Sequence, residues 1–214
     1  MRCYVHIHFS VSLFLKNLVI LKKTGLFFGS FNPIHIGHLI IANYMVEHSD
    51  LDEIWLIITP HNPHKLKKTL LNDHQRLTML RLAVENYPNL FASNIEFALP
   101  QPNYTVNTLA YLHEKYPDRD FVLLMGQDNL ASFHKWKNYQ YILDYYQIFV
   151  YPRITDKKGL PEIENHVSVT KIKAPIIEIS ATQIRNDIKQ AKNVRPMLPS
   201  EVFKYIDEMN FYKK

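Results

Sequence analysis

Short apolar runs alternate with stretches of helical periodicity along most of this chain. The runs are rich in aromatic and β-branched residues and end at glycine, proline or polar residues, which is typical of buried strands. A further β-like run covers residues 174–179. Strands are predicted at residues 24–28, 53–59, 91–99, 121–125, 147–151 and 167–172.

The stretches between these runs carry apolar residues three and four positions apart, the spacing of one helix face. Helices are predicted at residues 36–48, after a cap at Asn72 or Asp73, at 105–115, and from near Ser180 and Pro199. In the first helix this spacing is carried by Leu39, Ile40, Asn43 and Val46. The second has one apolar stripe, Leu77, Leu80, Ala83 and Val84, and the third is predicted to turn inward Val106, Leu109, Ala110 and Leu112.

Strands that alternate with helices at this spacing predict an α/β fold. We expect a Rossmann-like, doubly wound parallel sheet with helices on both faces, in a single domain. Ligands of such sheets lie beyond the carboxyl ends of the strands, where the strand order reverses. Residues that bind a ligand or act in catalysis are therefore expected in the loops after residues 28, 59, 99, 125 and 178.

Composition narrows the class of protein. The 214 residues are 47% hydrophobic and 21% charged, so the chain can bury a core and is not a disordered tail. A single cysteine excludes a disulfide framework and is typical of a reduced, cytoplasmic protein. The net charge of +5 is too small to require a nucleic-acid partner.

Residues 1–22 differ from the rest, because they hold three basic residues and no acidic one. Residues 23–214 then carry 22 basic and 20 acidic residues, a net charge of +2. The longest uncharged run in the leading segment has 13 residues, fewer than the roughly 20 of a membrane helix. We predict an appended extension at 1–22 and the folded domain at 23–214; an extra packed element and a targeting segment are the alternatives.

The segment GSFNPIHIGHL, residues 29–39, joins the first predicted strand to the first helix. Gly29 permits a tight turn, and Gly37 lets another group approach the backbone closely. His35 and His38 are three positions apart and so share one side of a helical turn. Two imidazoles beside the free N–H groups of a helix start suit a phosphate. Two ordinary loop histidines, or a metal pair that lacks a third ligand in the nearby sequence, are the alternatives.

The segment ISATQIR, residues 179–185, follows the last β-like run. Ser180 and Thr182 can cap the next helix, and Arg185 lies one turn further along. Alone, this segment is equally typical of an ordinary helix cap with a solvated arginine.

Together, these two segments resemble the H-x-G-H and ISxTxxR motifs of a nucleotidyltransferase superfamily. The resemblance is strongest to the bacterial nicotinate-nucleotide adenylyltransferases. It includes PHK at 63–65, NYTVNTL at 103–109, FVLLMGQDNL at 121–130 with Trp136, and PSEVFKYI at 199–206. Members of that family start just before a lysine-rich first strand, so residues 1–22 look like sequence upstream of the usual start.

The resemblance implies transfer of the adenylyl group of ATP to nicotinate mononucleotide in NAD biosynthesis, with Mg²⁺ accompanying ATP and no protein metal cage. It implies that His35 and His38 contact the ATP phosphates. Further ATP-binding positions implied by the motifs are Gly29, Ser30, Phe31, Asp128, Ser180, Thr182 and Arg185. Positions implied for the mononucleotide are Asn32, Lys65, Thr105, which would recognise the pyridine carboxylate, and Trp136, which would stack on the pyridine ring.

Two of these residues could have purely structural roles instead: Asp128 could cap a helix, and Trp136 could belong to the hydrophobic core. Asn32, Gln127 and Asn107 depart from residues frequent in the family, which bears on substrate placement and not on reaction class. An enzyme acting on nicotinamide mononucleotide or on phosphopantetheine is an alternative within the class. An RNA-binding module is the alternative outside it, although no RNA-binding signature is present. We expect no nucleic-acid or membrane partner; the oligomeric state is open.

Overall fold

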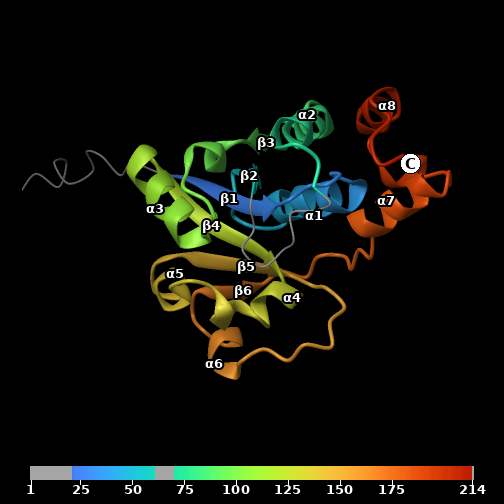
Figure 1. The fold of residues 1–214 in the computed structure, drawn as a ribbon. Helices are drawn as coiled ribbons and strands as arrows, with labels where there is room; N and C mark the ends of the chain where they lie inside the picture. Colours follow the sequence, from blue (N-terminus) through green and yellow to red (C-terminus); the bar gives the residue numbers. More distant parts are fainter. Residues whose placement is uncertain (1–20, 61–69, 214) are drawn as a thin grey trace, which may run out of the picture.

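The computed structural model describes residues 21–60 and 70–213. Its strands form a six-stranded sheet in the order β3-β2-β1-β4-β5-β6, in which every neighbouring pair is parallel (Figure 1). The strands are β1 (Lys22–Gly29), β2 (Glu53–Ile58), β3 (Leu90–Ser93), β4 (Arg119–Gly126), β5 (Gln147–Tyr151) and β6 (Val169–Lys171). The α/β class and the doubly wound parallel sheet are confirmed.

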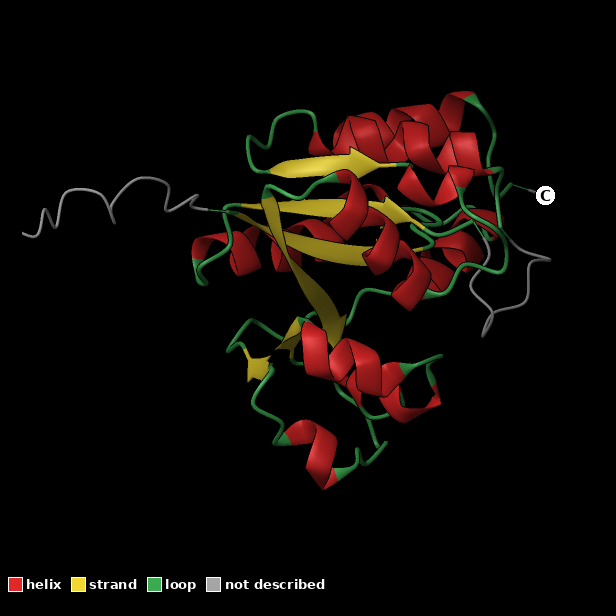
Figure 2. Ribbon diagram, turned by 90° about the vertical axis from the view of Figure 1, so that its left-hand side faces the viewer, coloured by secondary structure: helices red, strands yellow, loops and turns green. Residues whose placement is uncertain are grey.

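Helices fill the connections between the strands, and they flank the sheet on both sides (Figure 2). The α-helices are α1 (Ile36–Glu47), α2 (Asp73–Val84), α3 (Thr105–Lys115), α4 (Gln127–Leu130), α5 (Tyr139–Tyr145), α6 (Pro161–Glu164), α7 (Ala181–Lys189) and α8 (Ser200–Glu208). Short 3₁₀ turns lie at Ile95–Ala98, Phe133–Lys135 and Arg195–Met197. Figure 1 shows the C-terminal helix α8 beside α2, far from it in sequence.

Side chains of the central strands alternate between two separate cores, as the two-residue period of a strand requires. Phe27 and Leu124 face a core that includes residues of α1, α2, α7 and α8. Leu26 and Leu123 face the opposite core, which includes residues of α3, α5 and α6. The chain therefore crosses from one face of the sheet to the other after β3 and returns before α7.

Three details of the sequence prediction were wrong. The run 91–99 is a strand only to Ser93, because β3 is an edge strand whose ladder with β2 ends there, and a 3₁₀ turn follows. Helix α1 turns Ala42 and Met45 inward, while Ile40 and Asn43 are exposed. Ala110 of α3 is also exposed. Periodicity located these two helices correctly but did not fix which residues face the sheet.

The order of strands reverses between the central neighbours β1 and β4. Chain connections lead outward from this pair in opposite directions, which leaves a crevice at their carboxyl ends. The loops after Gly29 and Gly126 border this crevice, and both belong to segments that the sequence analysis selected.

Candidate functional site

A pair of histidines lies at the start of α1. His35 occupies the N-cap position in extended backbone geometry and is buried, and His38 follows in the first turn. The His35 N–H donates to His38 Nδ1 over 3.3 Å, and the two rings stack with centroids 3.7 Å apart. The loop therefore presents two adjacent imidazoles at a helix N-terminus, the arrangement predicted for an anion site.

Two glycines of this loop permit close approaches. A Cβ at Gly37 would lie 2.8 Å from Cγ2 of Ile177, so the segment before α7 packs directly on the α1 backbone, as predicted. A Cβ at Gly29 would lie 2.8 Å from the buried ring of Phe31. Gly29 does not have a positive φ, whereas Phe31 does, at 41°. The tight-turn interpretation of Gly29 was therefore wrong: contact with the ring excludes a larger residue there, and the strained backbone belongs to Phe31.

The two motifs meet in the structure although they are far apart in sequence. Arg185 of α7 donates from Nη1 to the carbonyl oxygen of Asn32 over 2.7 Å, across 153 positions of the chain. Its Nη2 donates to the hydroxyl of Thr182 over 3.1 Å. Ser180 is the N-cap residue of α7, and within the described residues its side chain accepts no capping hydrogen bond. Arg185 is therefore held at the edge of the histidine loop and is not simply solvated.

Asn32 lies beneath this surface, with 2% of its area exposed. Its Oδ1 accepts from the N–H of Leu71 over 3.3 Å and from the hydroxyl of Tyr212 over 2.8 Å. Because these donors come from the segment before α2 and from the C-terminal tail, Asn32 joins three parts of the chain at the histidine loop.

A buried arginine supports the same loop and was missed by the sequence analysis. Arg76 of α2 is fully buried and donates from Nη1 to the carbonyl oxygens of Ser30 and Thr59 over 2.6 and 3.2 Å. Its Nε donates to the Leu71 carbonyl oxygen over 3.2 Å, and its Nη2 pairs with Asp73 over 2.6 Å. Arg76 thus ties together the ends of β1 and β2 and the start of α2. The sequence did hold one sign of this burial, because Arg76 directly precedes Leu77 in the apolar stripe of the predicted helix.

The opposite wall of the site follows β4 and β5. Asp128 lies in the first turn of α4, and its Oδ1 is 3.9 Å from Nε of Arg153, which follows β5. Tyr151 at the end of β5 is buried, and burial raises its pKa to about 12. Arg153 and Tyr151 were also missed, since nothing local marks the residues after β5.

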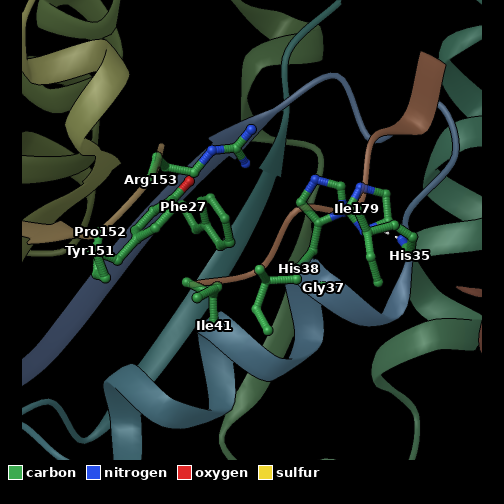
Figure 3. A pocket seen from close by; sticks show the side chains of 10 residues that line it. Phe27, His35, Gly37, His38, Ile41, Tyr151, Pro152, Arg153 and Ile179 are labelled. Atoms are coloured by element: carbon green, nitrogen blue, oxygen red, sulfur yellow. Dashed lines mark hydrogen bonds between the residues drawn. The ribbon is translucent and has the colours of Figure 1, made fainter. Parts of the chain in front are cut away.

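These walls enclose a pocket at the carboxyl ends of β1 and β5. It is lined by Phe27, His35, His38, Tyr151, Arg153 and Ile179, among others. Figure 3 shows the two imidazoles side by side at the start of α1, with the Arg153 side chain reaching into the pocket from the β5 side. A cationic guanidinium and a helix N-terminus facing one pocket favour an anionic ligand.

The imidazole of His35 is neutral at physiological pH. Burial, assisted by the positive charge of Arg153, lowers the pKa of His35 from 6.5 to about 4. Before a ligand binds, the His35 imidazole can therefore form hydrogen bonds in the pocket but adds no charge to it.

We expect the free energy of unfolding to decrease as the pH falls from 6.5 toward 4. In this window the unfolded chain protonates His35 and the folded protein does not, so acid favours the unfolded state. The contribution of neutral His35 is complete above pH 6.5 and is lost by up to about 3 kcal/mol near pH 4. Urea unfolding at stepped pH should show a smaller decrease for His35→Asn than for the unaltered protein. Substitution of the exposed His113 by alanine is the control, and parallel pH profiles for His35→Asn and the unaltered protein would contradict the assignment.

Thr105 and Trp136 lie on neighbouring elements, away from the histidine pocket's lining. Thr105 begins α3, and Trp136 follows a 3₁₀ turn and packs edge-on against Phe133, with ring centroids 5.4 Å apart. Lys137 Nζ lies 4.5 Å from the ring centroid of Tyr104, so the two segments are adjacent. The side chains of Thr105 and Trp136 are both half-buried. Lys65, the remaining candidate, lies outside the described residues.

A buried carboxyl group lies beside this second region. Glu96 is 1% exposed, its Oε1 accepts from the hydroxyl of Thr108 over 2.7 Å, and its carbonyl oxygen accepts from Asn103 Nδ2 over 3.2 Å. Burial raises the pKa of Glu96. These contacts fix the loop that leads into α3, and the sequence analysis did not identify them.

Within residues 21–60 and 70–213, no group of three or more histidine, cysteine or acidic side chains is arranged to hold a metal ion. No helix in that part of the chain is both long and apolar enough to cross a membrane.

Comparison with known proteins finds similarity to one family. A family model described as cytidylyltransferase-like matches residues 26–187. A probable nicotinate-nucleotide adenylyltransferase of Christiangramia forsetii is 62% identical over 192 residues, which are 90% of this chain and 99% of the relative. A probable nicotinate-nucleotide adenylyltransferase of Flavobacterium psychrophilum is 60% identical over 192 residues, 90% of this chain and 100% of the relative.

The fold is also similar to that of solved structures. The nicotinic acid mononucleotide adenylyltransferase of Plasmodium falciparum complexed with NaAD superimposes with a TM-score of 0.75 at 19% identity. That alignment covers 89% of this chain and 97% of the other. At 19% sequence identity, this similarity shows a shared fold and nothing more.

Proposed function

The chain belongs to the cytidylyltransferase-like family and, within it, to the nicotinate-nucleotide adenylyltransferases, and from this premise we infer how its site works. The enzyme transfers the adenylyl group of ATP to nicotinate mononucleotide in NAD biosynthesis, releasing pyrophosphate. The structural observation that best supports this activity is the hydrogen bond from Arg185 to Asn32, which joins the two motifs that we propose bind the phosphates.

We propose direct in-line transfer without a covalent intermediate. A phosphate oxygen of nicotinate mononucleotide forms a bond to the α-phosphorus of ATP, and the bond from that phosphorus to the bridging oxygen breaks as pyrophosphate leaves. The second pKa of a phosphate monoester is about 6, so the attacking group is already ionised near pH 7 and needs no general base. Positioning and charge stabilisation then provide the catalysis.

The histidine loop is the proposed triphosphate site. His38, in the first turn of α1, contacts the α-phosphate during transfer, and neutral His35 supports it by hydrogen bonding. Arg185, with Ser180 and Thr182, holds the β- and γ-phosphates that become the leaving group. The Gly29–Phe31 backbone packs against the nucleotide.

The wall after β4 and β5 is the proposed nucleoside side of the ATP site. Asp128 accepts hydrogen bonds from the ribose, and Arg153, whose Nε lies 3.9 Å from Asp128 Oδ1, orients that carboxylate. Arg153 also adds positive charge to the pocket that receives the phosphates.

The region of Thr105 and Trp136 is the proposed site of the mononucleotide. The half-buried Trp136 ring suits stacking on a flat pyridinium, and Thr105 with the N–H groups at the start of α3 suits the carboxylate. Lys65, in the sequence after β2, is the remaining residue that we propose binds the mononucleotide. Asn32, whose side chain is buried, contributes to substrate placement through the loop that it holds.

Enzymes of this class that use ATP generally require a divalent metal, and we propose Mg²⁺ here. Magnesium ions in proteins are often held by phosphate oxygens and water with few protein ligands, and this is the arrangement that we propose. Bound in that way, the ion would neutralise phosphate charge. We also propose that residues 23–214 are the catalytic domain and that the enzyme works in the cytoplasm.

Pyrophosphate release from ATP and Mg²⁺ should occur with nicotinate mononucleotide and be far slower with phosphopantetheine. Nicotinamide mononucleotide, assayed in parallel, measures how well the site separates a carboxylate from an amide. Activity with phosphopantetheine alone would overturn the acceptor assignment. Salt-sensitive RNA binding without pyrophosphate release would instead support the RNA-binding alternative.

A further inference from the structure

The chain after α8 folds back in an unusual backbone conformation. Asn210 and Tyr212 both have positive φ, at 52° and 63°. Between them, Phe211 is buried, and its N–H donates to the Ile206 carbonyl oxygen over 3.0 Å. Its ring packs edge-on against Tyr205 with centroids 5.5 Å apart. An aromatic residue with positive φ persists only where the surroundings hold it, so contacts of Tyr212 must stabilise this conformation.

The hydroxyl of Tyr212 reaches the histidine loop. It donates to Asn32 Oδ1 over 2.8 Å, across 180 positions of the chain, and this bond is shorter than the 3.3 Å bond from the Leu71 N–H to the same oxygen. The carbonyl oxygen of the same Asn32 accepts from Arg185. Burial raises the pKa of Tyr212, so its hydroxyl stays protonated and can donate throughout the physiological range.

We propose that Tyr212 is a positioning residue for adenylyl transfer. By holding the Asn32 side chain, its hydroxyl fixes the backbone on which Arg185 rests and from which the loop continues to His35. The C-terminal tail is therefore part of the structure that shapes the triphosphate site, although Tyr212 does not line the pocket. This inference rests on the proposed function, because the loop is taken to bind ATP.

The substitution Tyr212→Phe removes the hydroxyl and keeps the ring. We expect the affinity for ATP and kcat/KM for ATP each to fall between about two-fold and ten-fold, the range of one neutral hydrogen bond. The thermal midpoint should change by no more than a few degrees. Tyr205→Phe is the matched control: Tyr205 packs on the same Phe211 ring, and no hydrogen bond of its hydroxyl is found within the described residues. It should bind and use ATP like the unaltered protein.

A double variant separates positioning from a purely structural role. If Tyr212 acts through Asn32, then Asn32→Ala combined with Tyr212→Phe should lose no more ATP affinity than Asn32→Ala alone. Losses that multiply, or a Tyr212→Phe protein with unaltered ATP affinity and kcat/KM, would overturn the inference. ATP affinity is measured by calorimetry without a mononucleotide. A protein that binds ATP but makes no dinucleotide would therefore refute the proposed function while still deciding the role of Tyr212.

Discussion

Replacing His38 by alanine should lower kcat for adenylyl transfer by about 10²- to 10³-fold, the loss typical when one donor to a developing charge is removed. His38 Nδ1 accepts the His35 N–H, so in the neutral ring the proton resides on Nε2. That tautomer makes Nε2 a donor suited to a phosphate oxygen. Because the contact strengthens as charge develops on the reacting phosphate, kcat should fall much more than KM rises.

The measurement is steady-state pyrophosphate release with ATP and nicotinate mononucleotide varied in turn. His113→Ala is the matched control, because His113 is an exposed histidine of α3 outside the lining of the pocket. Its turnover should match that of the unaltered enzyme. A His38→Ala protein that keeps its thermal midpoint and turns over normally would refute the assigned role.

Much of the fold could be predicted because the strand and helix periods are local properties of the sequence. The buried runs at β1, β2 and β4 are continuous apolar segments, as expected for a parallel sheet covered on both faces. The end of β3 could not be predicted in this way. Residues 94–99 remain apolar in part, but β3 is an edge strand, and the contacts of buried Glu96 with Thr108 and Asn103 take the chain out of the sheet.

The short elements after β4 were also missed. Helix α5 begins after Asn138, which has a positive φ of 51°, and has only seven residues, too few to show a clear period. Such segments take their conformation from packing against the sheet, which local spacing does not reveal.

The candidate site was predicted to the extent that motifs lie on strand-to-helix junctions. Parallel strands bring their carboxyl ends together, so His35 and Arg185 could be expected at the same edge, and the structure brings them to one loop. Arg76, Arg153 and Tyr212 could not be found by the same reasoning. Each contacts a partner distant in sequence, and the burial or orientation of each side chain depends on the completed fold.

Substitution of Arg76 by methionine should reduce the free energy of unfolding by about 3–5 kcal/mol, the cost of breaking a buried, charged hydrogen-bond network. The variant keeps a long apolar side chain but removes the donors that satisfy the carbonyl oxygens of Ser30, Thr59 and Leu71. Asp73 is partly exposed, so water can compensate its carboxylate and the main loss falls on the carbonyl groups. Urea unfolding followed by circular dichroism measures the change.

Arg81→Met is the matched control on the same helix, because Arg81 is exposed and its loss should change stability by less than about 0.5 kcal/mol. Arg76→Lys should be intermediate, since an ammonium group has fewer donors and cannot reproduce the geometry of the guanidinium. If Arg76→Met were as stable as Arg81→Met, the ends of β1 and β2 would be held without this side chain. The expected order, with Arg76→Met least stable, would instead show that one buried arginine maintains the backbone on which the histidine loop and the proposed phosphate site depend.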